Sequence, residues 1–148
     1  MDEAKFWELI DFPLRRYKDV EVDSLTYRNI QMNHLHFFAK NTTQTELIDF
    51  QEIMSEKIYQ LFIPKIGEIA LISCYDLNAS LQISELSTDG FIDFRAWIIS
   101  LGQLNFKKFF NFQSEDEILE FDFNPNLCLL YTSPSPRDAT LSRMPSSA

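Results

Sequence analysis

The sequence is poor in glycine and in positive charge. Three glycines stand far apart along 148 residues, so no glycine-rich loop is available to cradle a phosphate group. Thirteen Lys and Arg face 22 Asp and Glu, and the net charge of −9 argues against binding to a nucleic-acid backbone. We therefore expect neither a phosphate-binding loop nor a nucleic-acid partner.

Residues that bind metals or act as nucleophiles are also scarce. The two histidines, His34 and His36, would point to different faces of a helix, which disfavours a shared metal ion. Cys74 lies in an apolar run, where a cysteine is usually a small buried side chain. We expect no metal site, no cofactor and no catalytic residue, and the balance favours a protein that is not an enzyme.

Long hydrophobic runs and a secretory signal are missing as well. No stretch approaches the roughly 18 apolar residues of a membrane span. The first residues are acidic and amphipathic, without the basic start and apolar core of a signal peptide. We expect a soluble, cytoplasmic protein without a membrane partner, in which Cys74 is a free thiol.

The composition changes abruptly after Leu127. Residues 128–148 hold one aromatic residue, five serines and three of the six prolines, whereas the preceding part holds the other 20 aromatic residues. The segment from Cys128 to Asp138 resembles the translated reading frame of a sequencing-library adapter, and an ordinary Ser/Pro-rich disordered tail is the alternative. We predict one domain over residues 1–127, truncated at its C-terminal end, and a non-native tail over residues 128–148.

Apolar residues at helical spacing predict a mainly α-helical, single-domain fold of about five to six helices with a disordered C-terminal tail. Thr43 to Glu46 form a capping box, so a helix should begin there and run to Phe62. Gly102 suits the left-handed position at the end of a helix. The predicted helices cover residues 2–11, 23–40, 43–62, the first part of 65–86, 88–101 and 103–111, with a last turn or two from Ser114.

Two details of packing follow from the same pattern. The N-cap of the second helix is either Asp23 or Ser24. The helix over 103–111 should contribute Leu104 and either Phe106 or Phe110 to the core. Phe121 and Phe123 have no obvious partner, as expected if the element that covered them is missing.

The densest polar cluster lies between Thr88 and Trp97. Arg95 is its unusual residue, because it lies beside the apolar stripe of the predicted helix, where a guanidinium group needs a carboxylate partner. The arrangement is either a structural ion pair, which we favour, or the floor of an anion-binding pocket. The residues of this candidate site are Glu8, Asp89, Asp93, Arg95 and Trp97.

Two segments carry a resemblance to a known family. The first is Phe6 to Ile10, and the second runs from Asp89-Gly-Phe91 through Phe94-Arg-Ala-Trp-Ile-Ile-Ser-Leu-Gly102. They resemble the bacterial family called domain of unknown function 4240, over most of residues 1–120. The resemblance implies a small, mainly helical cytoplasmic protein without an established activity. The chain departs from the family pattern at residues 69–72 and 85–87, where it lacks a Trp-Gly-Ala-Ala-like run and a Gly-Gly-Cys run.

Charge and composition then favour one function over another. Residues 1–127 hold 11 basic and 21 acidic residues, and this net charge of −10 would steer a basic protein towards the domain. We therefore predict a non-enzymatic protein-interaction module, for example an antitoxin-like or immunity-like inhibitor. The alternative is a small enzyme or ligand-binding domain with a pocket around Glu8, Asp89, Asp93 and Arg95.

Overall fold

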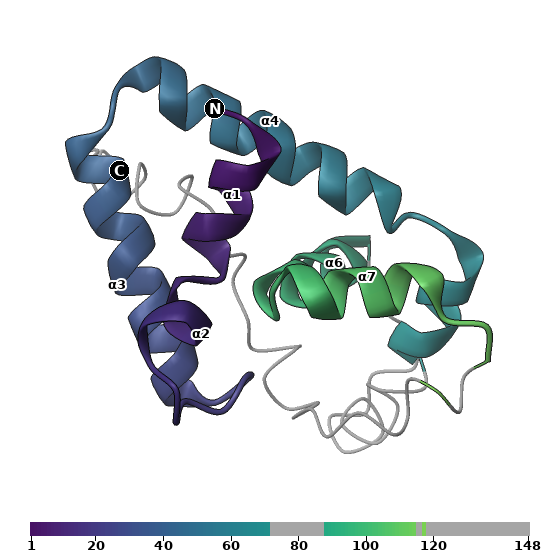
Figure 1. The fold of residues 1–148 in the computed structure, drawn as a ribbon. Coiled ribbons are helices and arrows are strands. Elements are labelled where there is room, and N and C mark those ends of the chain that lie inside the picture. Colours follow the sequence, from purple (N-terminus) through teal and green to yellow (C-terminus); the bar gives the residue numbers. More distant parts are fainter. Residues whose placement is uncertain (72–87, 115–116, 118–148) are drawn as a thin grey trace, which may run out of the picture.

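The computed structural model describes residues 1–71, 88–114 and 117 (Figure 1). The helices are α1 (Glu3–Ile10), α2 (Phe12–Arg16), α3 (Leu25–Asn41), α4 (Gln44–Gln60), α6 (Thr88–Ser100) and α7 (Gln103–Asn111), and residues 64–71 are also helical. The prediction of a mainly α-helical fold is therefore confirmed. Cys74, Phe121, Phe123, residues 72–86 of the segment predicted as a helix followed by a loop over 65–86, and the tail over 128–148 lie outside the described residues.

The helices begin where short polar side chains can satisfy free backbone N–H groups. The Asp2 carboxylate accepts a hydrogen bond from the Lys5 N–H at 2.8 Å, and the Thr43 hydroxyl accepts one from the Glu46 N–H at 3.2 Å. Of the two candidate caps for α3, the structure selects Ser24, which accepts from Tyr27. The helix that begins after Thr43 ends at Gln60, two residues earlier than predicted.

The predicted helices leave residues 12–22 uncovered, and the short helix α2 lies in this gap. Pro13 is the second residue of α2. A proline is tolerated there, since its missing N–H group would have no partner within the helix. α2 is therefore a separate helix that directly follows α1.

The core lies where the N-terminal helices meet α6 and α7. In Figure 1, α4 crosses the top of the molecule and α3 descends from one end of it, with α1 between them. α1 packs on both α3 and α4, and α6 joins α4 to α7. Aromatic side chains dominate the centre, and those that are fully buried include Phe6 of α1, Phe50 of α4, Trp97 of α6 and Phe109 of α7.

The residues of α7 that enter the core differ in part from those predicted. Phe106 is buried as expected, and the second buried residue is Phe109, not Phe110. The prediction that Leu104 enters the core is wrong, because its side chain is 68% exposed. Phe106 and Phe109 are three residues apart and share one face of the helix, whereas Leu104 points elsewhere.

Gly102 separates α6 from α7 and meets Asp11 there. Its φ of +102° lies in the region that favours glycine, as predicted. Its ψ of 167° is extended, and Gly102 is the N-cap residue of α7. A Cβ atom at Gly102 would lie 2.6 Å from the Asp11 carboxylate. That carboxylate accepts a hydrogen bond from the Gln103 N–H at 3.0 Å, so it supplies the cap that Gly102 lacks. Burial raises the pKa of Asp11.

Candidate functional site

Trp97, the last residue of the predicted cluster, lies in the interior. Its Nε1 donates a hydrogen bond to Asp23 Oδ1 at 2.8 Å, across 74 residues of sequence. Asp23 has a φ of +66°, an uncommon conformation that aspartate tolerates better than most residues. The bond therefore ties the segment before α3 to α6.

Two neighbouring side chains of α3 extend this buried network. The Tyr27 hydroxyl donates to the Ser100 carbonyl at 2.8 Å. The Gln31 amide nitrogen donates to the Ile10 carbonyl at 2.9 Å and to the Ser100 carbonyl at 3.0 Å. These carbonyls lie at the C-terminal ends of α1 and α6, which leave backbone acceptors without helical partners. The network joins three helices inside the protein.

Arg95 is buried, with 7% of its surface exposed, and carbonyl groups take the place of the expected carboxylate. Its Nη1 donates to the Ile58 carbonyl at 3.0 Å and its Nε to the Phe91 carbonyl at 3.3 Å. The guanidinium carbon lies 4.5 Å from the centre of the Phe91 ring and 5.0 Å from that of Phe62. Among the described residues, no carboxylate forms an ion pair with Arg95.

The three carboxylates of the predicted cluster do not share one place. Asp89 is exposed in the first turn of α6, and Asp93 is partly exposed on the same helix. Glu8 belongs to α1, where its Oε1 lies 3.7 Å from Nη1 of Arg15. The sequence thus placed Arg95 correctly beside the core, but its contacts are with the end of α4 and not with Glu8.

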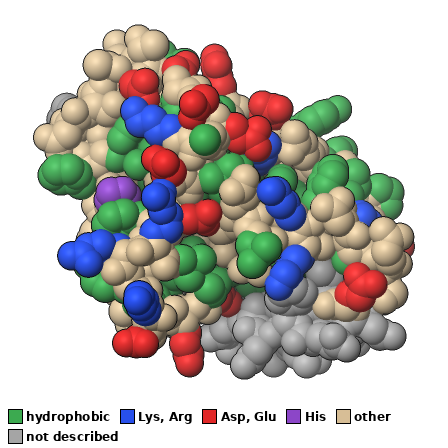
Figure 2. Space-filling view, in the orientation of Figure 1, with side chains coloured by type: hydrophobic (Ala, Val, Ile, Leu, Met, Phe, Trp, Pro, Cys, Tyr) green, Lys and Arg blue, Asp and Glu red, His purple; other side chains and the backbone are tan. Residues whose placement is uncertain are grey.

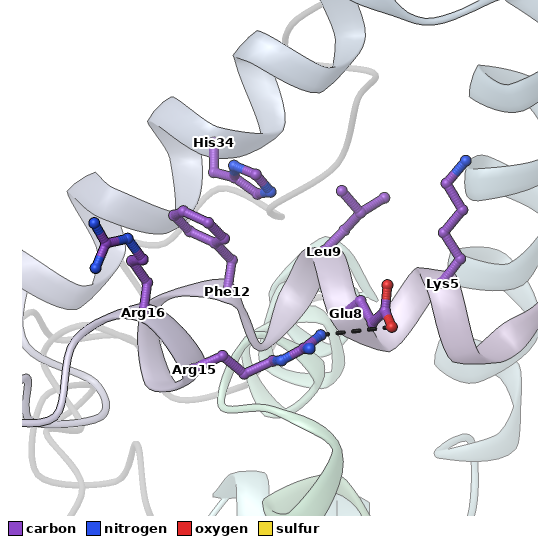
Figure 3. A pocket seen from close by; sticks show the side chains of 7 residues that line it. All are labelled: Lys5, Glu8, Leu9, Phe12, Arg15, Arg16 and His34. Atoms are coloured by element: carbon purple, nitrogen blue, oxygen red, sulfur yellow. Dashed lines mark ion pairs between the residues drawn. The ribbon is translucent and has the colours of Figure 1, made fainter.

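Glu8 lines a pocket of about 370 Å³ that the sequence did not predict (Figure 3). Three helices close together in the chain form it, with α1 and α2 on one side and α3 on the other. The Phe12 and His34 rings stack in parallel, with their centres 3.6 Å apart. The lining residues are Lys5, Glu8, Leu9, Phe12, Arg15, Arg16 and His34.

The charges of this pocket lie at its rim. Glu8 and Arg15 are 61% and 59% exposed, so their ion pair is screened by water. Lys5 reaches Glu46 of α4 at 3.1 Å. Burial lowers the pKa of His34, which favours a neutral ring at pH 7. The interior of the pocket is thus apolar and its rim is mostly basic, an arrangement suited to an organic anion.

The sequence offers a weak signal for this pocket in the pair Arg15 and Arg16. Both follow the proline that begins α2, in a chain with few cations. Their significance depends on Lys5 and His34, which the fold brings to the same place. Among the described residues, no group of His, Cys, Asp and Glu is placed to hold a metal ion. No helix in that part of the chain is long and apolar enough to cross a membrane.

A second feature lies at the C-terminal end of α4. Phe62, Ile63, Pro64, Gly67 and Phe91 line an apolar groove of about 240 Å³, and the Phe62 and Phe91 rings also contact the guanidinium group of Arg95. Tyr59 and Phe62 are 76% and 62% exposed. Figure 2 shows acidic side chains crowded over the upper part of the molecule, where Figure 1 draws α4. Exposed aromatic and acidic side chains therefore occur along the same helix.

The profile of a protein family described as "Protein of unknown function (DUF4240)" matches residues 1–125 of the chain. Neither the curated proteins nor the solved structures gave a match.

Proposed function

The chain belongs to the DUF4240 family, and we propose that it is a cytoplasmic, non-enzymatic domain that binds a basic partner protein. The observation that carries this proposal is the outward surface of α4 and of the residues that follow it. We call this surface the α4 face, and its members are Ile48, Glu52, Glu56, Tyr59 and Phe62.

The spacing of these residues places them along one side of the helix. Ile48, Glu52 and Tyr59 are separated by four and seven residues, which are whole turns of an α-helix. Ile48 is exposed although it is apolar, and Tyr59 is the most exposed large hydrophobic side chain of the described residues. Exposed apolar groups in a row, with acidic groups between them, are typical of a surface that another protein covers.

Charge indicates the nature of that protein. The whole chain carries −9, and Glu52 and Glu56 are exposed between the apolar members of the α4 face. A basic surface would be attracted over a distance and then oriented by these carboxylates. Tyr59 and Phe62 would act as anchors, because aromatic side chains contribute much of the binding energy at interfaces. An inhibitor of the antitoxin or immunity type fits this description.

The test compares matched variants in affinity capture from the native host, followed by binding of the purified pair. A Tyr59→Ser/Phe62→Ser variant removes the anchors, and Glu52→Lys/Glu56→Lys reverses the charge. Leu104→Ser is the control, because Leu104 is an equally exposed apolar residue on α7. We expect a basic protein that the wild type and the control bind directly, and that both α4 variants lose.

The proposal fails if no captured protein distinguishes the α4 variants from the control. It also fails if the purified partner binds all variants equally well. Raising the salt concentration should weaken the wild-type complex, because exposed charges on the two proteins attract each other less when screened.

The alternative, a small enzyme or ligand-binding domain built on Glu8, Asp89, Asp93 and Arg95, gains no support from their placement. Arg95 is held by two carbonyl groups, and Glu8 faces Arg15 on another pair of helices. Among the described residues, Glu8 and Arg95 therefore do not line a common cleft in which a reaction could use both side chains.

A further inference from the structure

The pocket between α1, α2 and α3 is separate from the α4 face and has a different chemistry. The chain has more acidic than basic residues, yet Lys5, Arg15 and Arg16 all line this pocket. They surround its apolar side chains. We propose that this pocket binds a small organic anion, with its carboxylate or phosphate group at Arg15 beside Glu8, its apolar part against Leu9 and Phe12, and Arg16 on the opposite side of the pocket (Figure 3).

The two arginines are available for a ligand. The Glu8–Arg15 distance of 3.7 Å is longer than a hydrogen bond, and both side chains are more than half exposed. Such a pair contributes little, so an anion can take the place of Glu8 at small cost. Arg16 lies over the Tyr17 ring at 5.6 Å, and among the described residues it forms no ion pair.

The interior of the pocket favours an anion with an apolar part over a bare ion. The His34 ring covers one face of Phe12, with only 5° between the two ring planes. Figure 3 shows Leu9 and Phe12 between Arg16 on one side and Glu8 with Lys5 on the other. The volume of about 370 Å³ is large enough for a small ligand to bury apolar surface there.

Substitution of Glu8 tests the proposal, because loss of this carboxylate should strengthen ligand binding and not weaken it. As the group that competes with the ligand for Arg15, it should weaken binding in the wild type. Glu8→Gln should therefore strengthen binding by about threefold, because a screened ion pair no longer has to be broken. Arg15→Gln/Arg16→Gln should weaken binding by about tenfold or more, since it removes the charge-assisted hydrogen bonds.

The experiment is a titration of the full chain, followed by backbone amide NMR, with benzoate, phenyl phosphate and inorganic phosphate as probes. We expect saturable shifts of α1, α2 and His34 with the two aromatic anions at millimolar concentration, and weaker binding of inorganic phosphate. Lys40→Gln/Lys107→Gln is the matched control, because it removes two charges from exposed positions on α3 and α7. This control should bind like the wild type.

Each outcome decides the proposal. Tighter binding of benzoate identifies a carboxylate ligand, and tighter binding of phenyl phosphate identifies a phosphate ester. The proposal is overturned if the aromatic anions cause no saturable shifts, or if the control loses as much affinity as the arginine variant. Unchanged or weaker binding by Glu8→Gln overturns the assignment of the anion to Arg15. Glu8, Arg15 and Arg16 are exposed, so these substitutions should leave the fold intact, and thermal unfolding of each variant checks this.

Discussion

Arg95 and Trp97 are two residues apart on α6, yet they lie in opposite kinds of surroundings. Trp97 is enclosed, and its Nε1 donates to a buried carboxylate from a distant segment. Arg95 lies at the edge of the core, where two backbone carbonyls and two rings hold its guanidinium group. Residues two apart on a helix point to nearly opposite sides, so one sequence motif serves two separate regions.

The comparison also shows how a buried polar group obtains its partners. Trp97 donates to a side chain, the Asp23 carboxylate, that only the tertiary fold brings to it. Arg95 donates to backbone groups, including the Ile58 carbonyl in the last turn of α4. Carbonyl groups at a helix end are acceptors that need no particular residue type. A search of the sequence for a carboxylate partner of Arg95 therefore could not identify these carbonyl groups.

The largest effect should come from the enclosed side. Trp97→Ala should lower the free energy of unfolding by about 3–5 kcal/mol, because it leaves a cavity in the core. Trp97→Phe keeps most of the ring and should cost less, about 1–3 kcal/mol, mainly through the lost hydrogen bond to Asp23. Urea denaturation measures both. An unchanged stability of Trp97→Phe would show that this bond contributes nothing.

The edge of the core should tolerate change better. Arg95→Ala should cost about 3 kcal/mol, through lost packing and lost hydrogen bonds to carbonyls. Arg95→Met keeps an apolar stem beside the Phe62 and Phe91 rings and should cost about 1 kcal/mol, because the carbonyl partners of Arg95 are not charged. The same urea experiment applies. If Met were as damaging as Ala, the charge of Arg95 itself would be required.

Lys57 offers a contrast with Arg95, because this buried cation does have a carboxylate partner. Its Nζ lies 2.7 Å from Glu3 Oε1, and the hydrogen bond from Lys57 lowers the pKa of Glu3. The stabilising effect is present above pH 4.5 and is lost as the pH falls through the lowered pKa. Glu3→Gln should cost about 1 kcal/mol at pH 7, since Glu3 is itself half exposed.

Measurement of unfolding between pH 7 and pH 3 checks this difference. The wild type should lose its advantage over Glu3→Gln in acid, whereas the cost of Arg95→Met should stay constant. A constant difference between wild type and Glu3→Gln across this range would contradict the pairing with Lys57.

The smallest effect should come from His34 in the pocket. Burial lowers the pKa of His34 below its ordinary 6.5, so the folded protein binds a proton there less readily than the unfolded chain. Stability should therefore fall slightly as the pH drops below 6.5, by less than about 1 kcal/mol for this partly exposed ring. His34→Gln should flatten the profile.

The sequence by itself determined most of the helices, with α2 as the exception. Asp2, Ser24 and Thr43 each cap a helix through a hydrogen bond to an N–H three residues later, and the apolar spacing then selects the buried face. These interactions are local, so a single sequence contains all of their members. The family followed from two short segments for the same reason, since its motifs lie within single helices.

Only the tertiary structure decided which side chains meet. Asp11 caps α7 across 92 residues, and Trp97 finds Asp23 across 74. The pocket is equally hidden in the sequence, because its basic rim needs Lys5 and Arg16 to come together with the Phe12–His34 stack. Such encounters depend on how helices pack, and the packing depends on the shape of every buried side chain at once. The local sequence pattern therefore does not show how the helices pack.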